Sequence, residues 1–241
     1  PDWTTPGIAL NVFLECNDAA GIAAAQAMRP VAADNCSATN PPVKVSGLLV
    51  PSGTCPQAGT YTNTFTVTDN CGNISAPFTQ IITLEDNTAP DIIAPGVAVI
   101  SCMDDPNNLA LTGSPTTTDN CDAAPVITHT DVTILSTCGG DYKIVRTWKA
   151  TDHCGNFSTA NQDIFIQDIA GPVISALPAP FTIDCQDTPA FTTPTAVDAC
   201  ASSFTLTSAD VTTPGTCANT YSITRTWTAT DACGNKSTAS Q

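Results

Sequence analysis

The sequence is short of basic residues, and this shortage excludes several kinds of partner. Its 241 residues include only 7 Lys and Arg against 22 Asp and Glu, giving a formal net charge of −15. Such a chain cannot build the basic surface that binds nucleic acids or anionic membranes. It suits divalent cations, because carboxylate and carbonyl oxygens are the ligands that hard cations prefer. Solubility through net charge is the other interpretation, and it stays open.

Histidines, metal-binding cysteine pairs and long apolar runs are scarce or missing. The only histidines are His129 and His153, and no Cys-x-x-Cys occurs, which disfavours zinc and iron–sulfur sites. No Ser/His/Asp or Cys/His set supports catalysis, so we expect a protein that is not an enzyme. No apolar run approaches the roughly 18 residues of a membrane span, and no signal peptide is present. Because the chain opens at Pro1 in mid-pattern, we interpret it as a piece of a longer, processed protein.

What the chain has in quantity is threonine, proline and cysteine. Hydrophobic residues make up 42%, aromatic residues only 6%, and long helical patterns are absent. This composition favours β structure with many turns and cores built from aliphatic side chains. Twelve regularly spaced cysteines indicate disulfides and an oxidising, extracellular location.

The cysteines form three sets of four that recur about every 80 residues. The sets are Cys16, Cys36, Cys55 and Cys71; Cys102, Cys121, Cys138 and Cys154; and Cys185, Cys200, Cys217 and Cys233. Four markers that keep one period indicate a tandem array, and the period suits a small Ig-like sandwich. We therefore predict an all-β tandem array of three Ig-like β-sandwich domains, each with two disulfides, over residues 1–86, 87–168 and 169–241. The third repeat stops before its equivalent of 163–168, so we expect its last strand to be missing and the natural chain to continue.

The clearest predicted strand is 221–230, where apolar residues alternate with Ser and Thr. Trp148 and Trp227 fall on the apolar face of equivalent strands and are expected in the core. Arg146 and Arg225 share that face, and we expect them near its edge or stacked on the ring, with their heads in water.

Two local features break the symmetry of the array. The first repeat has Asn63 and Phe65 where the others have Arg and Trp, so its core should differ. The Ala-rich segment Asp18–Arg29 predicts a short helix that the other repeats lack.

Within a repeat, four cysteines allow three pairings. A long strand separates the third cysteine from the fourth, and the roughly 7 Å limit on a disulfide's Cα separation excludes that pairing. In an Ig-like order the second and fourth cysteines lie at one end and the first and third at the other. The predicted disulfides are Cys16–Cys55, Cys36–Cys71, Cys102–Cys138, Cys121–Cys154, Cys185–Cys217 and Cys200–Cys233.

An Asp stands two positions before the second and fourth cysteine of every set, and each linker adds another acid. Three carboxylates with turn carbonyls at a junction would suit Ca²⁺. The alternative is that these acids cap turns by accepting backbone N–H groups, and both interpretations stay open. The candidate ligands are Asp34, Asp69, Asp86, Asp119, Asp152, Asp168, Asp198 and Asp231.

The motif Ala/Val-Thr-Asp-x-Cys-Gly-Asn, with the Asp-Asn-Thr-Ala-Pro junction at 86–90, resembles hyalin-repeat (HYR)-like and bacterial Ig-like repeats. With four cysteines and Arg-Thr-Trp at 146–148 and 225–227, it is most similar to repeats of giant Bacteroidota surface adhesins of the SprB gliding type. The resemblance implies Ig-like sandwiches, type IX secretion and a filament on the outer membrane. It also implies stiffening Ca²⁺ at Asp69, Asp86, Asp152 and Asp231.

The predicted function is therefore a non-catalytic, stiff stalk of an extracellular adhesin used in adhesion or gliding. Its expected partners are neighbouring repeats of the same chain, surface polysaccharide or other filament chains. The alternative is a carbohydrate-binding module array of a secreted enzyme, which would need exposed Trp residues. A third option is an ice- or mineral-binding surface formed by Thr faces.

Overall fold

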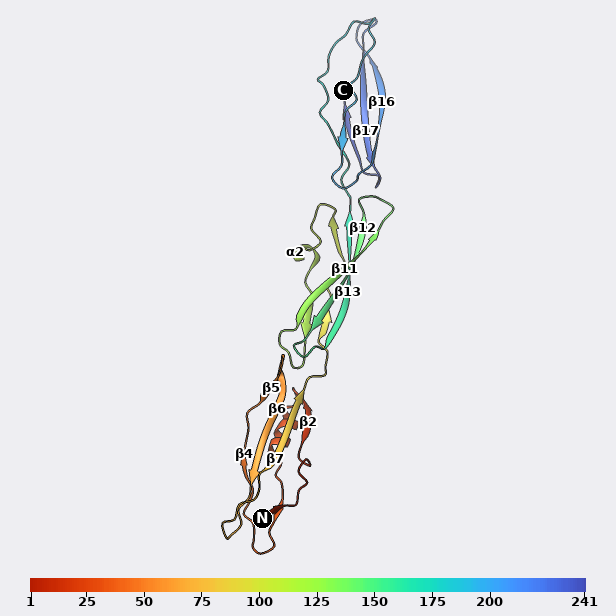
Figure 1. Cartoon of the computed structure of the whole chain (residues 1–241). Helices are drawn as coiled ribbons and strands as arrows, with labels where there is room; N and C mark the ends of the chain where they lie inside the picture. Colours follow the sequence, from red (N-terminus) through yellow and green to blue (C-terminus); the bar gives the residue numbers. More distant parts are fainter. The chain divides into compact units, whose positions relative to one another are not determined.

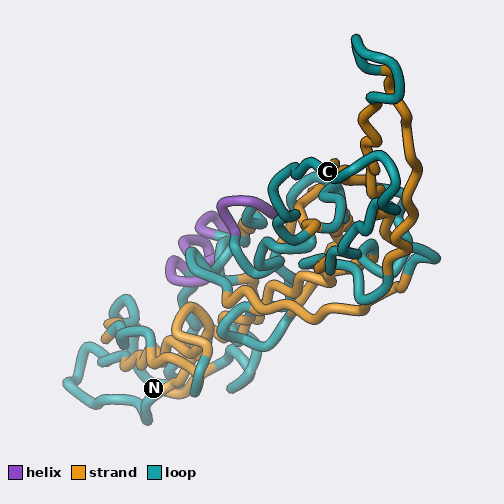
Figure 2. Tube along the Cα trace, turned by 90° about the horizontal axis from the view of Figure 1, so that it is seen from above, coloured by secondary structure: helices purple, strands orange, loops and turns teal.

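The computed structural model describes all residues, 1–241, and is built almost entirely of strands and loops (Figure 2). Helix is confined to α1 (Ala19–Ala27) and the single turn α2 (Leu109–Thr112). This confirms the all-β fold class. The chain contains no helix long and apolar enough to cross a membrane.

The chain forms two compact units, and their limits do not follow the sequence repeats. Unit 1 comprises residues 1–93, 116–128 and 148–160, and unit 2 comprises 94–115, 129–147 and 161–241. Each unit thus combines segments from two successive repeats. The division into three domains at 86/87 and 168/169 stays a prediction.

The largest sheet lies in unit 1 and has the strand order β2-β7-β6-β4, with β5 also paired to β6 (Figure 1). β2 runs parallel to β7, whereas β6 is antiparallel to β4, β5 and β7. Its strands are β2 (Val12–Glu15), β4 (Val43–Val45), β5 (Val50–Ser52), β6 (Cys55–Thr66) and β7 (Phe78–Glu85). The antiparallel pairs β1 (Asp2–Trp3) with β3 (Ala32–Ala33) and β8 (Asp91–Ile93) with β10 (Thr116–Thr118) also lie in this unit.

The later strands repeat this arrangement. A four-stranded sheet has the order β11-β12-β13-β9, and β13 runs parallel to β9 as β7 does to β2. Its strands are β9 (Ala98–Ser101), β11 (Val126–Leu135), β12 (Tyr142–Thr151) and β13 (Phe157–Gln167). The last strands are β14 (Val173–Ile174), β15 (Ala196–Val197), β16 (Phe204–Pro214), β17 (Tyr221–Asp231) and β18 (Lys236–Ser240), with β17 between β16 and β18.

Helix α1 confirms the helix predicted within Asp18–Arg29. The Asp18 carboxylate accepts a hydrogen bond of 2.8 Å from the backbone N–H of Gly21 and so caps the helix. Ala25 on this helix is buried against Ile82 and Leu84 of β7. The one-turn helix α2 was not predicted; it is capped by the Asn108 side chain, which accepts from the N–H of Ala110.

The large aromatic side chains lie in the core, as predicted. Trp148 and Trp227 are each only 3% exposed, which confirms them as core residues. The first repeat uses a different core, as expected, because buried Asn63 donates to Gln80 (3.0 Å) and Phe65 meets Phe78 edge to face.

The expectation that both arginine heads are wet was wrong for Arg146. Its side chain is completely buried, and its guanidinium bonds both oxygens of Asp131 at 2.8 Å. It also donates to the carbonyl oxygen of Pro106 (3.0 Å). Arg225 is partly exposed, as expected, and its guanidinium lies closer to the centre of the Phe191 ring (4.4 Å) than to that of the Trp227 ring (6.0 Å) on which it was expected to stack.

Candidate disulfide and cation sites at the repeat junctions

The disulfides join successive repeats, and the predicted pairing within repeats was wrong. The first cysteine of one set bonds to the second of the next set, and the third bonds to the fourth of the next. The four bonds are Cys16–Cys121, Cys55–Cys154, Cys102–Cys200 and Cys138–Cys233. None of the predicted bonds Cys16–Cys55, Cys36–Cys71, Cys102–Cys138, Cys121–Cys154, Cys185–Cys217 and Cys200–Cys233 is formed.

The error lay in the choice of partner and not in the placement of the cysteines. The N–H of Cys16 donates to the backbone oxygen of Glu85 at the end of β7, and Gly59, four positions after Cys55 on β6, pairs with Leu84 of β7. The first and third cysteines therefore lie at one end of the sheet, as expected. Each bonds to a turn of the following repeat, with Cα separations of 6.0 and 4.5 Å in unit 1. The predicted pairing was limited to partners within one repeat.

Four cysteines are free and exposed: Cys36, Cys71, Cys185 and Cys217. They are the second and fourth members of the first set and the first and third members of the last set.

The Cys-Gly-Asn turn holds the linker between repeats. In unit 1 the Asp152 Oδ1 atom accepts from the N–H groups of Cys154 and Asn156, each at 2.8 Å. The Asn156 side-chain amide donates to Asp152 Oδ2 (2.9 Å) and to the backbone oxygen of Asp86 (2.9 Å). Gly155 takes φ +99°, a backbone region that favours glycine. The Asn of the motif thus joins its own turn to the incoming linker.

Unit 2 repeats these contacts residue for residue. Asp231 Oδ1 accepts from the N–H groups of Cys233 and Asn235 at 2.8 Å. The Asn235 side chain donates to Asp231 Oδ2 (2.9 Å) and to the backbone oxygen of Asp168 (2.8 Å). The second junction therefore keeps the same hydrogen bonds between the turn and the linker, even though its linker sequence departs from Asp-Asn-Thr-Ala-Pro.

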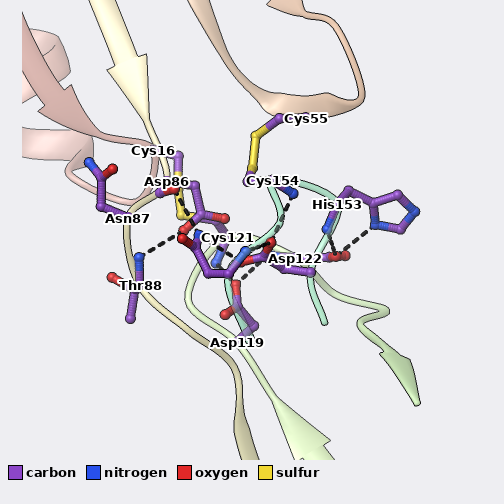
Figure 3. Close-up of a disulfide and its surroundings, with 12 residues drawn as sticks. Cys16, Cys55, Asp86, Asn87, Thr88, Asp119, Cys121, Asp122, His153 and Cys154 are labelled. Atoms are coloured by element: carbon purple, nitrogen blue, oxygen red, sulfur yellow. Dashed lines mark hydrogen bonds and ion pairs between the residues drawn. A yellow bond between two sulfur atoms is a disulfide. The ribbon is translucent and has the colours of Figure 1, made fainter. Parts of the chain in front are cut away.

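Three carboxylates meet at the first junction. Asp86, Asp119 and Asp152 each offer an oxygen within 4.8 Å of the others (Figure 3 shows Asp86 and Asp119 beside the two disulfides). Asp119 Oδ1 caps its turn by accepting from Cys121 N (2.8 Å), and Asp86 Oδ1 accepts from Thr88 N (3.3 Å). The Oδ2 atoms of Asp86 and Asp119 are buried and accept no hydrogen bond. In Asp86 and Asp119 one oxygen therefore accepts a backbone N–H group and the other has no partner, whereas both oxygens of Asp152 accept hydrogen bonds.

The charges at this junction are not balanced by any basic side chain. The pKa of Asp86 is raised, first because burial removes water from the carboxylate and then because Asp119, Asp152 and Glu15 repel its charge. Asp86 is only 7% exposed. A buried carboxylate with an unpaired oxygen is costly unless a positive charge joins it.

The second junction presents the same electrostatics in unit 2. Asp168 is 5% exposed, and its Oδ2 atom also accepts no hydrogen bond. Its pKa is raised by burial and then by the charges of Asp198, Asp231 and Asp141. Asp198 caps its turn by accepting from Cys200 N at 2.8 Å.

Asp34 and Asp69 lie in the equivalent turns of the first repeat. Asp34 accepts from Cys36 N (2.9 Å) and lies 3.0 Å from the amino group of Pro1. These contacts lower the pKa of Asp34 to about 2, the backbone hydrogen bond of Cys36 being the largest cause. Asp69 accepts from Cys71 N, Asn73 N and the Asn73 amide, and its pKa is also lowered. Asp86, Asp119 and Asp152 thus form a triad, Asp168 feels the charges of Asp198 and Asp231, and Asp34 and Asp69 act as turn caps.

Three acids with structural roles were not singled out from the sequence. Asp131 pairs with Arg146, and Asp210 pairs with Arg225 through two hydrogen bonds of 2.7 Å. Each acid stands 15 positions before its arginine, a signal that the sequence contains. Asp122, 3% exposed, accepts from the backbone and ring nitrogens of His153 at 3.0 and 2.7 Å (Figure 3).

Comparison with protein families identifies the last repeat. Residues 173–241 match a HYR-like domain with 4 cysteines. The HYR-like domain begins at Val173, directly after the Pro172 that ends the second linker. Comparison with curated proteins gave no match.

Among solved structures, the chain is similar at low sequence identity to cadherin ectodomains. Human CDH23 EC21-23 is 16% identical, with 75% of this chain and 72% of that chain covered and a TM-score of 0.32. Drosophila N-cadherin EC1-4 is 12% identical, with 76% of this chain and 56% of that chain covered and a TM-score of 0.31. Human Protocadherin-24 EC1-2 is 15% identical, with 70% of this chain and 98% of that chain covered and a TM-score of 0.30.

Proposed function

We propose that the chain is a non-catalytic segment of an extracellular adhesion-type repeat protein, in which each repeat junction is fixed by two disulfides and one Ca²⁺ ion. The HYR-like match at 173–241 and the disulfides support the extracellular, adhesion-type assignment. The observation that carries the cation is the pair of buried, unpartnered oxygens of Asp86 and Asp119 beside Asp152. A hard divalent cation is the partner that such oxygens prefer.

At the first junction Asp86, Asp119 and Asp152 would hold the ion. Bound Ca²⁺ supplies the positive charge that these carboxylates lack. Asn156 fixes the position of Asp86 through its backbone oxygen, and the two disulfides hold the turns that carry Asp119 and Asp152. In unit 2 the ion would be held in the same way by Asp168, Asp198 and Asp231. There the Oδ2 atom of Asp168 is buried and unpartnered, and a bound cation would balance its charge.

The finer attribution follows the resemblance. We infer a surface adhesin of the Bacteroidota type, carried by type IX secretion and used as a stiff stalk in adhesion or gliding, with neighbouring repeats, polysaccharide or other filament chains as partners. The carbohydrate-binding alternative is less well supported, because Trp148 and Trp227 are buried and the Trp3 indole donates to Ala76 (2.7 Å).

The cation is tested by thermal unfolding under non-reducing conditions in Ca²⁺ and in EDTA. Free Ca²⁺ at 100 times the dissociation constant of the site stabilises the folded state by about 2.7 kcal/mol, so Ca²⁺ should raise the melting temperature. D86N should lose the part of this shift that belongs to unit 1, while D2N, which changes an exposed acid outside the triads, should keep all of it. An identical melting curve in EDTA and Ca²⁺ would refute the cation and leave the disulfides as the main junction bonds.

A further inference from the structure

The three carboxylates of the first junction all come from the linker and the following repeat. Asp86 lies in the linker, and Asp119 and Asp152 lie in turns of the second repeat. The first repeat supplies none of them, although its cysteines bond to both of these turns. An ion held by the triad alone would therefore not contact the repeat that precedes the linker.

Glu15 brings a fourth carboxylate to the first junction from that preceding repeat. One of its oxygens lies within 4.8 Å of an oxygen of Asp86. Glu15 is half-buried, and its Oε2 and Oε1 atoms accept from the backbone and side-chain nitrogens of Asn87, both at 3.5 Å. Bonds this long hold the carboxylate near the linker but leave its charge largely uncompensated. Burial raises the pKa of Asp86, and the charge of Glu15 is one of those that raise it further.

Asp141 does the same at the second junction, although it comes from a different point of its repeat. Its Oδ1 atom accepts a hydrogen bond of 2.7 Å from the backbone N–H of Asp168. Burial raises the pKa of Asp168, and the charge of Asp141 is one of those that raise it further. Gly140 leaves room for the Asp168 side chain, because a Cβ at that glycine would lie 2.6 Å from it. The preceding repeat thus adds an acid to this junction too.

Each repeat has an acid at one of these two positions and an uncharged residue at the other. The positions are the residue before the first cysteine and the third residue after the third cysteine. In chain order the pairs are Glu15 and Ala58, Ser101 and Asp141, and Asp184 and Thr220.

The linker changes together with the position of the acid. Asn87, which contacts Glu15, is replaced by Ile169 in the second linker, where Ser101 stands in the place of Glu15. One negative charge per repeat is therefore kept at the linker while the residue that carries it changes. A charge that reaches one place from two different positions indicates a common partner at that place.

We propose that the preceding repeat completes each cation site with a fourth carboxylate, Glu15 at the first junction and Asp141 at the second. This inference rests on the proposed function, since it names a further ligand of the same ion. The ion would then contact all three parts of a junction, namely the end of one repeat, the linker and two turns of the next repeat. The number of charged oxygen ligands sets the affinity of Ca²⁺ sites, so the fourth acid should be felt as affinity.

The test isolates one site at a time in the full chain. D168N/D198N keeps only the first site, and D86N/D119N keeps only the second. The Asn side chains can still accept the backbone hydrogen bonds that these acids accept. Titration calorimetry with calcium chloride under non-reducing conditions then measures one dissociation constant in each background.

E15Q should weaken Ca²⁺ binding by about tenfold or more in the first background, whereas D141N should leave it unchanged. In the second background the two effects should be exchanged. Each variant is thus the control of the other, and a general loss of folding cannot produce this exchange. E85Q is the matched charge control in the first background, and it should change binding little. Glu85 also accepts from Asn87, at 3.3 Å, but its charge is not among those that raise the pKa of Asp86, which burial raises first.

Three results would overturn this inference and leave the proposed function standing. They are unchanged affinity in both E15Q and D141N, equal losses in E15Q and E85Q, and a loss in D141N when only the first site is present. Absence of Ca²⁺ binding in both backgrounds would refute the proposed function and this inference together.

Discussion

Arg146 and Arg225 stand at the same place in two repeats but in different surroundings. Both make two hydrogen bonds to an acid on the neighbouring strand, at 2.7–2.8 Å. Arg146 is completely buried, whereas the side chain of Arg225 is 32% exposed. Burial raises the cost of removing Arg146, because its guanidinium donates to Asp131 and to the Pro106 carbonyl oxygen at a place closed to water.

We predict that R146L destabilises unit 2 by about 2–3 kcal/mol, because it removes charge-assisted hydrogen bonds from a buried guanidinium. The matched change R225L removes an exposed pair and should cost at most about 1 kcal/mol. Urea unfolding of the two variants checks this, and equal losses would contradict the role given to burial.

A second residue-scale prediction concerns pH. The folded state holds the proton of Asp86 more tightly than the unfolded chain, since the pKa of this carboxyl is raised. Stability therefore falls as pH rises from about 4, the unfolded pKa of Asp, through the raised folded value. In EDTA the free energy of unfolding of D86N minus that of the wild type should therefore increase as pH rises from about 4 to 7. The capping acids Asp34 and Asp69 give the opposite slope in both proteins and cancel.

The control for this experiment is the same pair of proteins in Ca²⁺. There the wild type should be the more stable at pH 7, because the ion needs the charge that D86N removes. A constant difference across pH in EDTA would show that Asp86 is not strained by its neighbours.

Much of the residue-scale picture could be predicted from sequence. The Trp positions followed from the period of two, and the meeting of Asp86, Asp119 and Asp152 followed from the fixed spacing of Asp to cysteine and the acid of the linker. The depth of Arg146 could not be predicted, because it depends on Pro106 and Asn107, which approach it from a distant loop.

At the scale of elements, the repeated turn depends on one glycine in each copy. Gly72, Gly155 and Gly234 have φ between +89° and +99°. The turn lets the following Asn reach both its own Asp and the linker carbonyl. A Cβ added at Gly155 would meet no atom within 4 Å, so the glycine is required by backbone conformation and not by space.

G155A should therefore destabilise unit 1 by about 1–2 kcal/mol through backbone strain alone. G96A is the control, since that glycine also has open space around it but no positive φ, and it should change stability little. Equal effects of the two substitutions in thermal unfolding would contradict this account of the turn.

Element prediction succeeded where the signal was local. Helix α1 followed from an Ala-rich run behind Asp18, which also supplies the cap. The single turn α2 has only four residues and one capping Asn, too short a signal to distinguish from a loop.

At the scale of the whole molecule, the disulfides connect neighbours and not the halves of one domain. Cysteine spacing indicated which cysteines share an end of a sheet, but not whether each bonds within its repeat or beyond it. A sequence period cannot separate these cases, because the same spacing returns in every repeat.

Peptide mapping of the non-reduced chain should recover Cys16–Cys121, Cys55–Cys154, Cys102–Cys200 and Cys138–Cys233, and finding bonds within a repeat would contradict the structure. These bonds close loops of 95–105 residues, worth about 4–5 kcal/mol each by loop entropy. C16A/C121A should lower the free energy of unfolding of unit 1 by about this amount and so lower its melting temperature. The melting temperature of unit 2 should stay unchanged and serves as the internal control.

The same bonds limit how far the chain can be pulled. A tensile load applied at Pro1 and Gln241 has a covalent route through residues 1–16, 121–138 and 233–241, crossing the bonds Cys16–Cys121 and Cys138–Cys233. That route is about 40 residues, or roughly 140 Å when taut, against roughly 800 Å for the unbridged chain. Even if every strand came apart under load, most of the contour length would stay locked, so a tether of this kind would break or hold but would not lengthen.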